Sequence, residues 1–158
     1  MDIRNPLFRR QQVPVAIENT IHALLRVSIC LVTDEEAVSV TAKQNFEELT
    51  GNEGVTRLNS YQAWDEILAG KISFGAYIID AQLKNIGMQL AMILHCIANH
   101  VPFAVVINVS AINPQEEKLY RDLKTSGVTI VQTDDLLLPV VWSNSFLSLA
   151  ESLTQKPA

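Results

Sequence analysis

Cysteine, basic charge and long apolar runs are all scarce in this chain of 158 residues, and each scarcity excludes a class of protein. The two cysteines, Cys30 and Cys96, fall in an expected strand and an expected helix, which favours buried reduced thiols over a disulfide framework. The 12 Lys and Arg residues stand against 17 Asp and Glu residues, and the net charge is −5. The chain therefore has no general basic field for nucleic acid or an anionic membrane surface.

The apolar runs are short as well. Val101 to Ile107 is far below the ~20 residues that cross a bilayer. Residues 1–27 lack the apolar core and cleavage site of a secretory signal. We therefore expect a cytoplasmic protein without a membrane partner. The N-terminal cluster of Arg4, Arg9 and Arg10 is interpreted as a solvated tail, with a contact role as the alternative.

What the chain does have is a regular alternation of short β-rich runs and amphipathic segments. Five runs rich in branched and aromatic residues predict buried strands: Arg26–Thr33, Val55–Leu58, Phe74–Asp80, Val101–Val109 and Val128–Val131. Helices are expected at 15–25, 37–50, 61–68, 88–98, 114–126 and 139–153. Gly51 is expected to end one helix in the left-handed conformation, and Asn113 followed by Pro114 to begin another. In the helix at 61–68, Trp64, Ile67 and Leu68 are expected to face inward.

This alternation predicts an α/β fold, a doubly wound five-stranded parallel sheet of order 2-1-3-4-5, with an extra N-terminal segment. A hydrophobic content of 48% over this length suits one principal domain. We expect residues 1–26 to be an N-terminal extension containing one helix. Residues 27–153 are then the domain itself, and residues 154–158 a tail or linker.

Carboxylates follow two strands that this order makes neighbours. Asp34 and Glu35 come after the first strand, and Asp80 ends the third. Because the carboxyl ends of parallel strands meet at one edge of the sheet, the three side chains are expected to converge there, where Mg²⁺ would offset their repulsion. Taken singly, Asp34 and Glu35 also suit the first turn of a helix, and Asp80 also suits a turn.

These residues resemble the CheY-like receiver domain of two-component response regulators, over roughly Val27 to Leu153. In that family an acidic pair after the first strand and an Asp after the third hold Mg²⁺, and that Asp accepts a phosphoryl group from a histidine kinase. The resemblance implies that Asp34 and Glu35 match the pair and that Asp80 is the phosphoacceptor candidate.

The resemblance fails in the basic half of the site. Ser110, 30 residues after Asp80, matches the family's Ser or Thr, although it also suits a loop cap. Gln132, 52 residues after Asp80, stands where the family has Lys, and Thr129 stands where many members have a switching aromatic residue. Gln132 donates hydrogen bonds but brings no charge to phosphoryl oxygens.

We therefore expect a degenerate, or pseudo-receiver, signalling module that is not an enzyme, needs no cofactor and acts by protein contact or dimerisation. One alternative is a receiver phosphorylated on Asp80 with Mg²⁺ by a histidine kinase. A second is a flavodoxin-like cofactor binder, although Asp34, Glu35 and Glu36 would repel a phosphate in the first loop.

The expected contact surface is the family's fourth helix, fifth strand and fifth helix. Trp142, Phe146 and Tyr120 are the interface candidates there, because apolar residues surround more of the last helix than one buried face requires. The alternative is that the helix at 15–25 packs on this surface or exchanges between subunits. Nucleic acid enters only through an output domain outside these residues, in a longer signalling or transcription-regulatory protein.

Overall fold

Five parallel strands form one sheet in the order β2-β1-β3-β4-β5. The computed structural model describes residues 15–83 and 86–154. Its strands are β1 (Ile29–Val32), β2 (Val55–Leu58), β3 (Ala76–Asp80), β4 (Phe103–Asn108) and β5 (Thr129–Thr133). The predicted order is confirmed, and it is the arrangement of the flavodoxin-like and CheY-like α/β folds.

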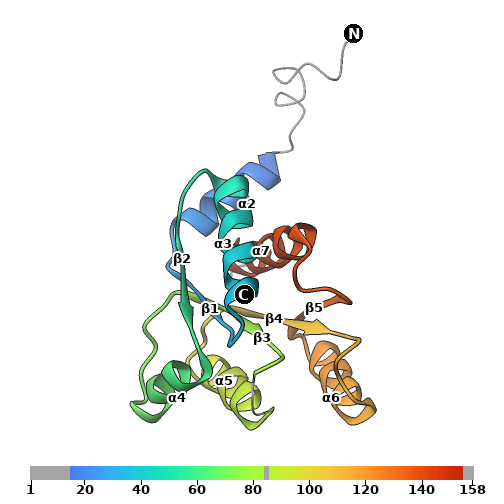
Figure 1. Ribbon diagram of the computed structural model, residues 1–158. Coiled ribbons are helices and arrows are strands. Elements are labelled where there is room, and N and C mark those ends of the chain that lie inside the picture. Colours follow the sequence, from blue (N-terminus) through green and yellow to red (C-terminus); the bar gives the residue numbers. More distant parts are fainter. Residues whose placement is uncertain (1–14, 84–85, 155–158) are drawn as a thin grey trace.

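Helices cover both faces of this sheet. They are α2 (Val15–Leu25), α3 (Glu36–Thr50), α4 (Ser60–Leu68), α5 (Ile86–Ala98), α6 (Pro114–Thr125) and α7 (Pro139–Thr154). Figure 1 shows α2, α3 and α7 on one side of the strands and α4, α5 and α6 on the other. We call these the α7 side and the α5 side. Among the described residues, no helix combines the length and the apolar character that a membrane span requires.

The alternation of side chains along β3 divides the core between the two sides. Ala76 and Ile78 belong to the apolar cluster on the α7 side, whereas Tyr77 and Ile79 belong to the cluster on the α5 side. All five residues of β3 are buried, as expected for a central strand of a parallel sheet. The strand that ends at Asp80 is therefore fixed by packing on both faces.

Two helix caps that the sequence predicts are present at the expected residues. Gly51 ends α3 with a φ of 79°, and its N–H donates to the carbonyl of Glu47. The Oδ1 atom of Asn113 accepts from the N–H of Glu116, with Pro114 first inside α6. These caps depend on neighbours three or four residues away, so a local sequence pattern predicts them.

The interface prediction for Trp142, Phe146 and Tyr120 is corrected, because all three side chains are buried within the chain, at 0%, 0% and 1% exposure. Helix α2 packs against α7 on the side away from the strands, so α7 is covered twice. The Trp142 indole N–H donates to the carbonyl of Leu136 at 2.8 Å. The apolar surround of α7 thus reflects intramolecular packing, and α2 forms the helix expected at its residues.

The orientation predicted for α4 is partly wrong. Trp64 and Leu68 are exposed, at 38% and 68%, whereas Ala63 and Glu66 are buried and Ile67 is half-buried. The Glu66 carboxylate accepts hydrogen bonds from the Tyr77 hydroxyl and from the Ser73 N–H, the latter at 2.9 Å. Because these two donors satisfy it, the Glu66 carboxylate is tolerated at a buried position, and the helix turns Trp64 outward.

Candidate functional site

The site begins with Asp80, the last residue of β3, whose side chain is fully buried. The Thr33 hydroxyl donates to its Oδ2 atom at 2.8 Å. The Gln82 N–H donates to its Oδ1 atom at 3.0 Å. Both carboxylate oxygens therefore have donors from the protein, and neither reaches solvent.

Burial raises the pKa of Asp80 from 3.8 to about 6. The hydrogen bonds from Thr33 and Gln82 oppose this rise by stabilising the ionised form, and the negative charges of Glu35 and Asp34 add to it. The carboxyl group is thus mainly ionised at neutral pH and mainly protonated in mild acid.

Thr33 is the site residue that the sequence did not single out. It follows β1 directly and is fully buried. Its hydroxyl donates to Asp80 and accepts from the Glu35 N–H at 3.1 Å, while its carbonyl accepts from Arg57 Nε at 3.1 Å. Since Val32 pairs with Ile79, the next residues of the two strands lie side by side. The strand register was the signal that would have indicated Thr33.

Asp34 points toward α4 and serves as a cap there. Its Oδ1 atom accepts from the Ser60 N–H at 2.8 Å, and the Ser60 hydroxyl lies 2.8 and 2.9 Å from its two carboxylate oxygens. Ser60 opens α4, where N–H groups are left without helical partners and the dipole favours an anion. Glu35, at the start of α3, is exposed and makes no side-chain cap bond.

The three-carboxylate Mg²⁺ site predicted at Asp34, Glu35 and Asp80 is not assembled. Within residues 15–83 and 86–154, no three His, Cys, Asp or Glu side chains are placed to hold a metal ion. The reason is the direction of each carboxylate: Asp80 is bonded inside the sheet edge, Asp34 is bonded to the start of α4, and Glu35 lies in solvent.

Ser110 and Thr129 are not level with Asp80 in the sheet, because Asp80 pairs with Val106 and Val106 pairs with Val131. Ser110 is exposed beyond the end of β4, with its N–H donating to Asn108 Oδ1 at 3.0 Å. Thr129 opens β5 and pairs with Ala104 near the start of β4, whereas Asp80 ends its strand. These positions lie at different levels of the sheet.

Gln132 lies on the other face of the sheet from Asp80. Ile130, two residues before Gln132, packs on the α5 side, whereas Ile78, two residues before Asp80, packs on the α7 side. Strand β4 also separates the two strands, which puts their backbones roughly 10 Å apart. Gln132 is exposed and is not a partner of the buried carboxylate.

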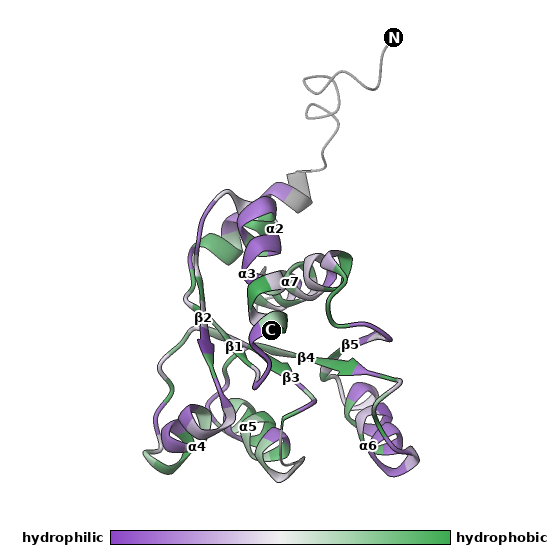
Figure 2. Cartoon of the chain, in the orientation of Figure 1, coloured by the Kyte–Doolittle hydropathy of each residue, from purple (hydrophilic) through white to green (hydrophobic). Residues whose placement is uncertain are grey.

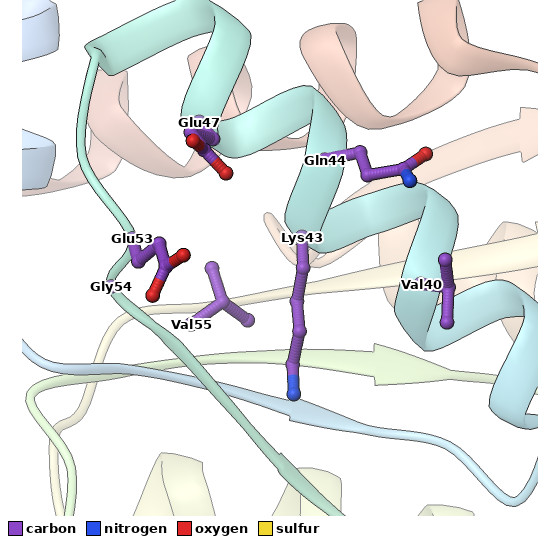
Figure 3. A pocket seen from close by; sticks show the side chains of 7 residues that line it. All are labelled: Val40, Lys43, Gln44, Glu47, Glu53, Gly54 and Val55. Atoms are coloured by element: carbon purple, nitrogen blue, oxygen red, sulfur yellow. The ribbon is translucent and has the colours of Figure 1, made fainter.

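A hollow of about 330 Å³ lies elsewhere, between α3 and the start of β2. Figure 3 shows Glu47 and Glu53 turned toward the space between helix and strand, with Lys43 beside them. Val55, which borders it, opens β2 and pairs with Ile29, the first residue of β1. This hollow therefore lies at the amino ends of the strands, whereas Asp80 lies at a carboxyl end. Its charged side chains are all exposed, and no predicted site residue lines it.

At the carboxyl ends of the strands, hydrogen bonds therefore connect the end of β1 to Asp80 of β3 and to Ser60 at the start of α4. This arrangement holds a buried anion by neutral donors and leaves no oxygen of Asp80 open to a ligand. Comparisons with protein family models, with curated protein sequences and with solved structures each found no match.

Proposed function

We propose that this chain is a receiver-like signalling module that acts by protein contact, catalyses no reaction and uses Asp80 as a structural residue. The observation that carries the proposal is the state of the Asp80 carboxylate, which is 0% exposed and accepts from Thr33 and Gln82 on its two oxygens. The strand order supports the receiver-like part of the proposal.

Phosphoryl transfer to a carboxylate makes demands that this site does not meet. An attacking oxygen must approach the phosphorus in line, and cations must offset the negative charge on the phosphoryl oxygens. Here the oxygens of Asp80 are buried, and the Asp34 carboxylate is bonded to Ser60. Gln132, at the position of the family's Lys, is neutral and lies on the other face.

The proposed role of Asp80 is to join the ends of two strands. Thr33 and Asp80 are 47 residues apart in the chain, and their hydrogen bond closes the edge at which β1 leads into α3. A hydrogen bond to a charged group contributes about 1.5 to 3 kcal/mol. Such a contribution offsets part of the cost of burying the carboxylate, so the Asp80–Thr33 pair serves as a structural link without phosphorylation.

The partners in this proposal are proteins, either a different chain or a second copy, and the chain serves as a regulatory domain. Because α2 covers α7, the expected surface of α6, β5 and α7 is reduced to α6, β5 and the exposed start of α7 around Val140. A histidine kinase belongs only to the rival function below.

The rival function, phosphoryl acceptance on Asp80 with Mg²⁺, is favoured by one observation. The charges of Glu35 and Asp34 act on Asp80 and raise its pKa, and a cation at this edge would relieve their repulsion. The rival requires the Thr33 and Gln82 bonds to open so that an oxygen of Asp80 becomes accessible.

Incubation with acetyl phosphate and Mg²⁺, followed by intact-mass measurement, separates the two functions. We expect the mass of the full chain to remain unchanged, because the Asp80 oxygens are enclosed. A receiver domain that accepts acetyl phosphate serves as the positive control. A phosphoryl adduct that disappears in Asp80→Asn would overturn the proposed function and support the rival.

A further inference from the structure

The start of the chain differs in charge from the rest of it. Residues 1–14, which we call the arm, lie outside the described residues and contain one acidic residue, Asp2, and three basic ones, Arg4, Arg9 and Arg10. Removing these four charges from the totals of 12 basic and 17 acidic residues leaves 9 and 16, a net charge of −7. The arm is therefore attracted electrostatically to the remainder of the chain.

Acidic residues are dense on α3 and on the loop that follows it. From Glu35 to Gly54 the chain has five carboxylates, all exposed, and one basic residue, Lys43. In Figure 2, the end of α3 is mostly purple, whereas α5 on the other side of the sheet is mostly green. Helix α2, which the arm precedes, packs against α3. The arm thus enters the domain beside this acidic region.

The hollow of about 330 Å³ between α3 and the start of β2, here called the α3–β2 hollow, lies within this region. Its lining combines charged and apolar groups. Glu47, Glu53 and Lys43 border it, as Figure 3 shows, together with Val40, which is 48% exposed, and the half-buried Val55. A ligand in this hollow would meet carboxylates and an apolar surface at once.

The arm carries apolar and basic side chains next to each other. Leu7 and Phe8 directly precede Arg9 and Arg10. A guanidinium group binds a carboxylate through two parallel hydrogen bonds, and neighbouring apolar side chains gain free energy by covering apolar surface. The side chains of the arm therefore suit both parts of the lining.

The charges also agree in number and sign. The arm brings three guanidinium groups and one carboxylate, that of Asp2. The hollow and the adjoining Glu48 bring three carboxylates and one ammonium group, that of Lys43. Lys43 would repel an arginine, and Asp2 is the group of the arm that would pair with it.

The length of the arm allows this contact. Val55 pairs with Ile29, the first residue of β1, and only residues 26–28 separate β1 from α2, so the end of α2 lies near the hollow. Helix α2 has 11 residues and is about 16 Å long, a distance that roughly five extended residues span. An arm that runs back along α2 would bring Arg10 to the end of this helix and the residues before it to the hollow.

We infer that the α3–β2 hollow is an interaction surface for an apolar segment that contains arginine, and that its occupant is residues 2–10 of the chain's own arm. Charge, lining and reach agree on this place. The contact lies within one chain and does not depend on the proposed function. Under that function, the docked arm competes with a basic segment of a protein partner for the hollow.

The test places a nitroxide on the arm of the full chain through Asn5→Cys, a neutral position among the charged ones. Cys30 and Cys96 are buried, and burial raises the pKa of both thiols, so the label attaches to residue 5. In ¹⁵N-enriched protein, we expect the amide signals of Lys43 and Gly54 to lose most of their intensity relative to the reduced label. The amide signals of α6 should keep theirs.

Charge reversal of the lining should release the arm. In Glu47→Lys/Glu53→Lys, the signals of the hollow should regain their intensity. Asp65→Lys/Asp122→Lys is the matched control: it makes the same change of charge at two exposed carboxylates of α4 and α6, on the other side of the sheet, and should keep the loss of intensity. Circular dichroism verifies that both double variants are folded.

Three outcomes overturn the inference. The first is full intensity at Lys43 and Gly54 in the labelled chain, and the second is an equal loss in Glu47→Lys/Glu53→Lys. The third is a loss in ¹⁵N-enriched chain that carries no label but is mixed with labelled copies, which would place the arm of one chain on another. The phosphoryl adduct on Asp80 is a separate result and concerns the proposed function alone.

Discussion

Asp80 and Glu66 are buried carboxylates that pack on opposite faces of the sheet, and each accepts a hydrogen bond from a hydroxyl. Thr33 donates to Asp80 from β1, and Tyr77 donates to Glu66 from β3. A buried carboxylate without donors would be strongly destabilising, so each hydroxyl is part of what allows the acid at its position. Each of these two buried carboxylates is therefore one member of a hydrogen-bonded pair with a hydroxyl group.

The pKa of Asp80 predicts how stability depends on pH. Because the folded pKa of about 6 lies above the ordinary 3.8, the folded chain binds the proton more tightly, and stability falls as pH rises through this interval. Asp80→Asn stays neutral and should lose this fall, which corresponds to roughly 3 kcal/mol in the free energy of unfolding. Urea unfolding at a series of pH values measures it.

Asp122→Asn, a change of the same chemistry at an exposed residue of α6, is the control and should keep the wild-type pH profile. If the Asp80→Asn profile ran parallel to that of wild type between these two pKa values, burial would not govern the ionisation of Asp80.

At the scale of elements, α2 explains the composition of α7. A helix that packs only on a sheet has one free face, but α7 packs on the sheet and also contacts α3 beside it and α2 on the side away from the strands. Leu24 of α2 and Trp142 and Phe146 of α7 belong to the same apolar cluster, and the rings of Phe146 and Phe46 meet edge to face with centroids 4.9 Å apart. The segment before β1 is thus packed as part of the domain.

Adjacent leucines in α2 test this conclusion. Leu24 is 1% exposed and Leu25 is 40% exposed. Leu24→Ala should lower the free energy of unfolding by about 2 to 5 kcal/mol through lost burial and a residual cavity. Leu25→Ala, the matched control, should cost less than about 1 kcal/mol. Equal, small effects in chemical denaturation would mean that α2 adds little to the fold.

At the scale of the whole molecule, the two apolar clusters share the same strands. Residues of β1, β3, β4 and β5 alternate between the cluster on the α7 side and the cluster on the α5 side. Neither cluster can lose its strands without exposing the other, so the described domain should unfold in one cooperative transition.

The two tryptophans report on the two sides separately. Trp142 is buried in the apolar cluster on the α7 side, and Trp64 is 38% exposed on α4, on the α5 side. At fixed protein concentration, we expect fluorescence and far-ultraviolet circular dichroism to give the same urea midpoint within Trp64→Phe, where only Trp142 emits. The same agreement is expected within Trp142→Phe, although its midpoint is lower. Different midpoints for the two signals within one variant would show that the two sides unfold independently.

The extent of prediction differs between the fold and the site. Strand runs, the helix end at Gly51, the helix start at Asn113 and the order of the sheet followed from the sequence, because each rests on neighbours a few residues away or on the alternation of strand and helix. The positions of Asp34 and Asp80 at strand ends followed too. Their directions did not, since these depend on Ser60 and Thr33, which are 26 and 47 residues distant.

By itself, the sequence determined a doubly wound sheet with acidic residues at its carboxyl edge, since hydrophobic periodicity is a local property of the chain. Only the tertiary structure decided that Asp80 is enclosed, that α7 is covered by α2, and that Trp64 of α4 is exposed while Trp142 of α7 is buried. The physical reason is that a side chain's burial and hydrogen-bond partners are set by which distant elements pack beside it.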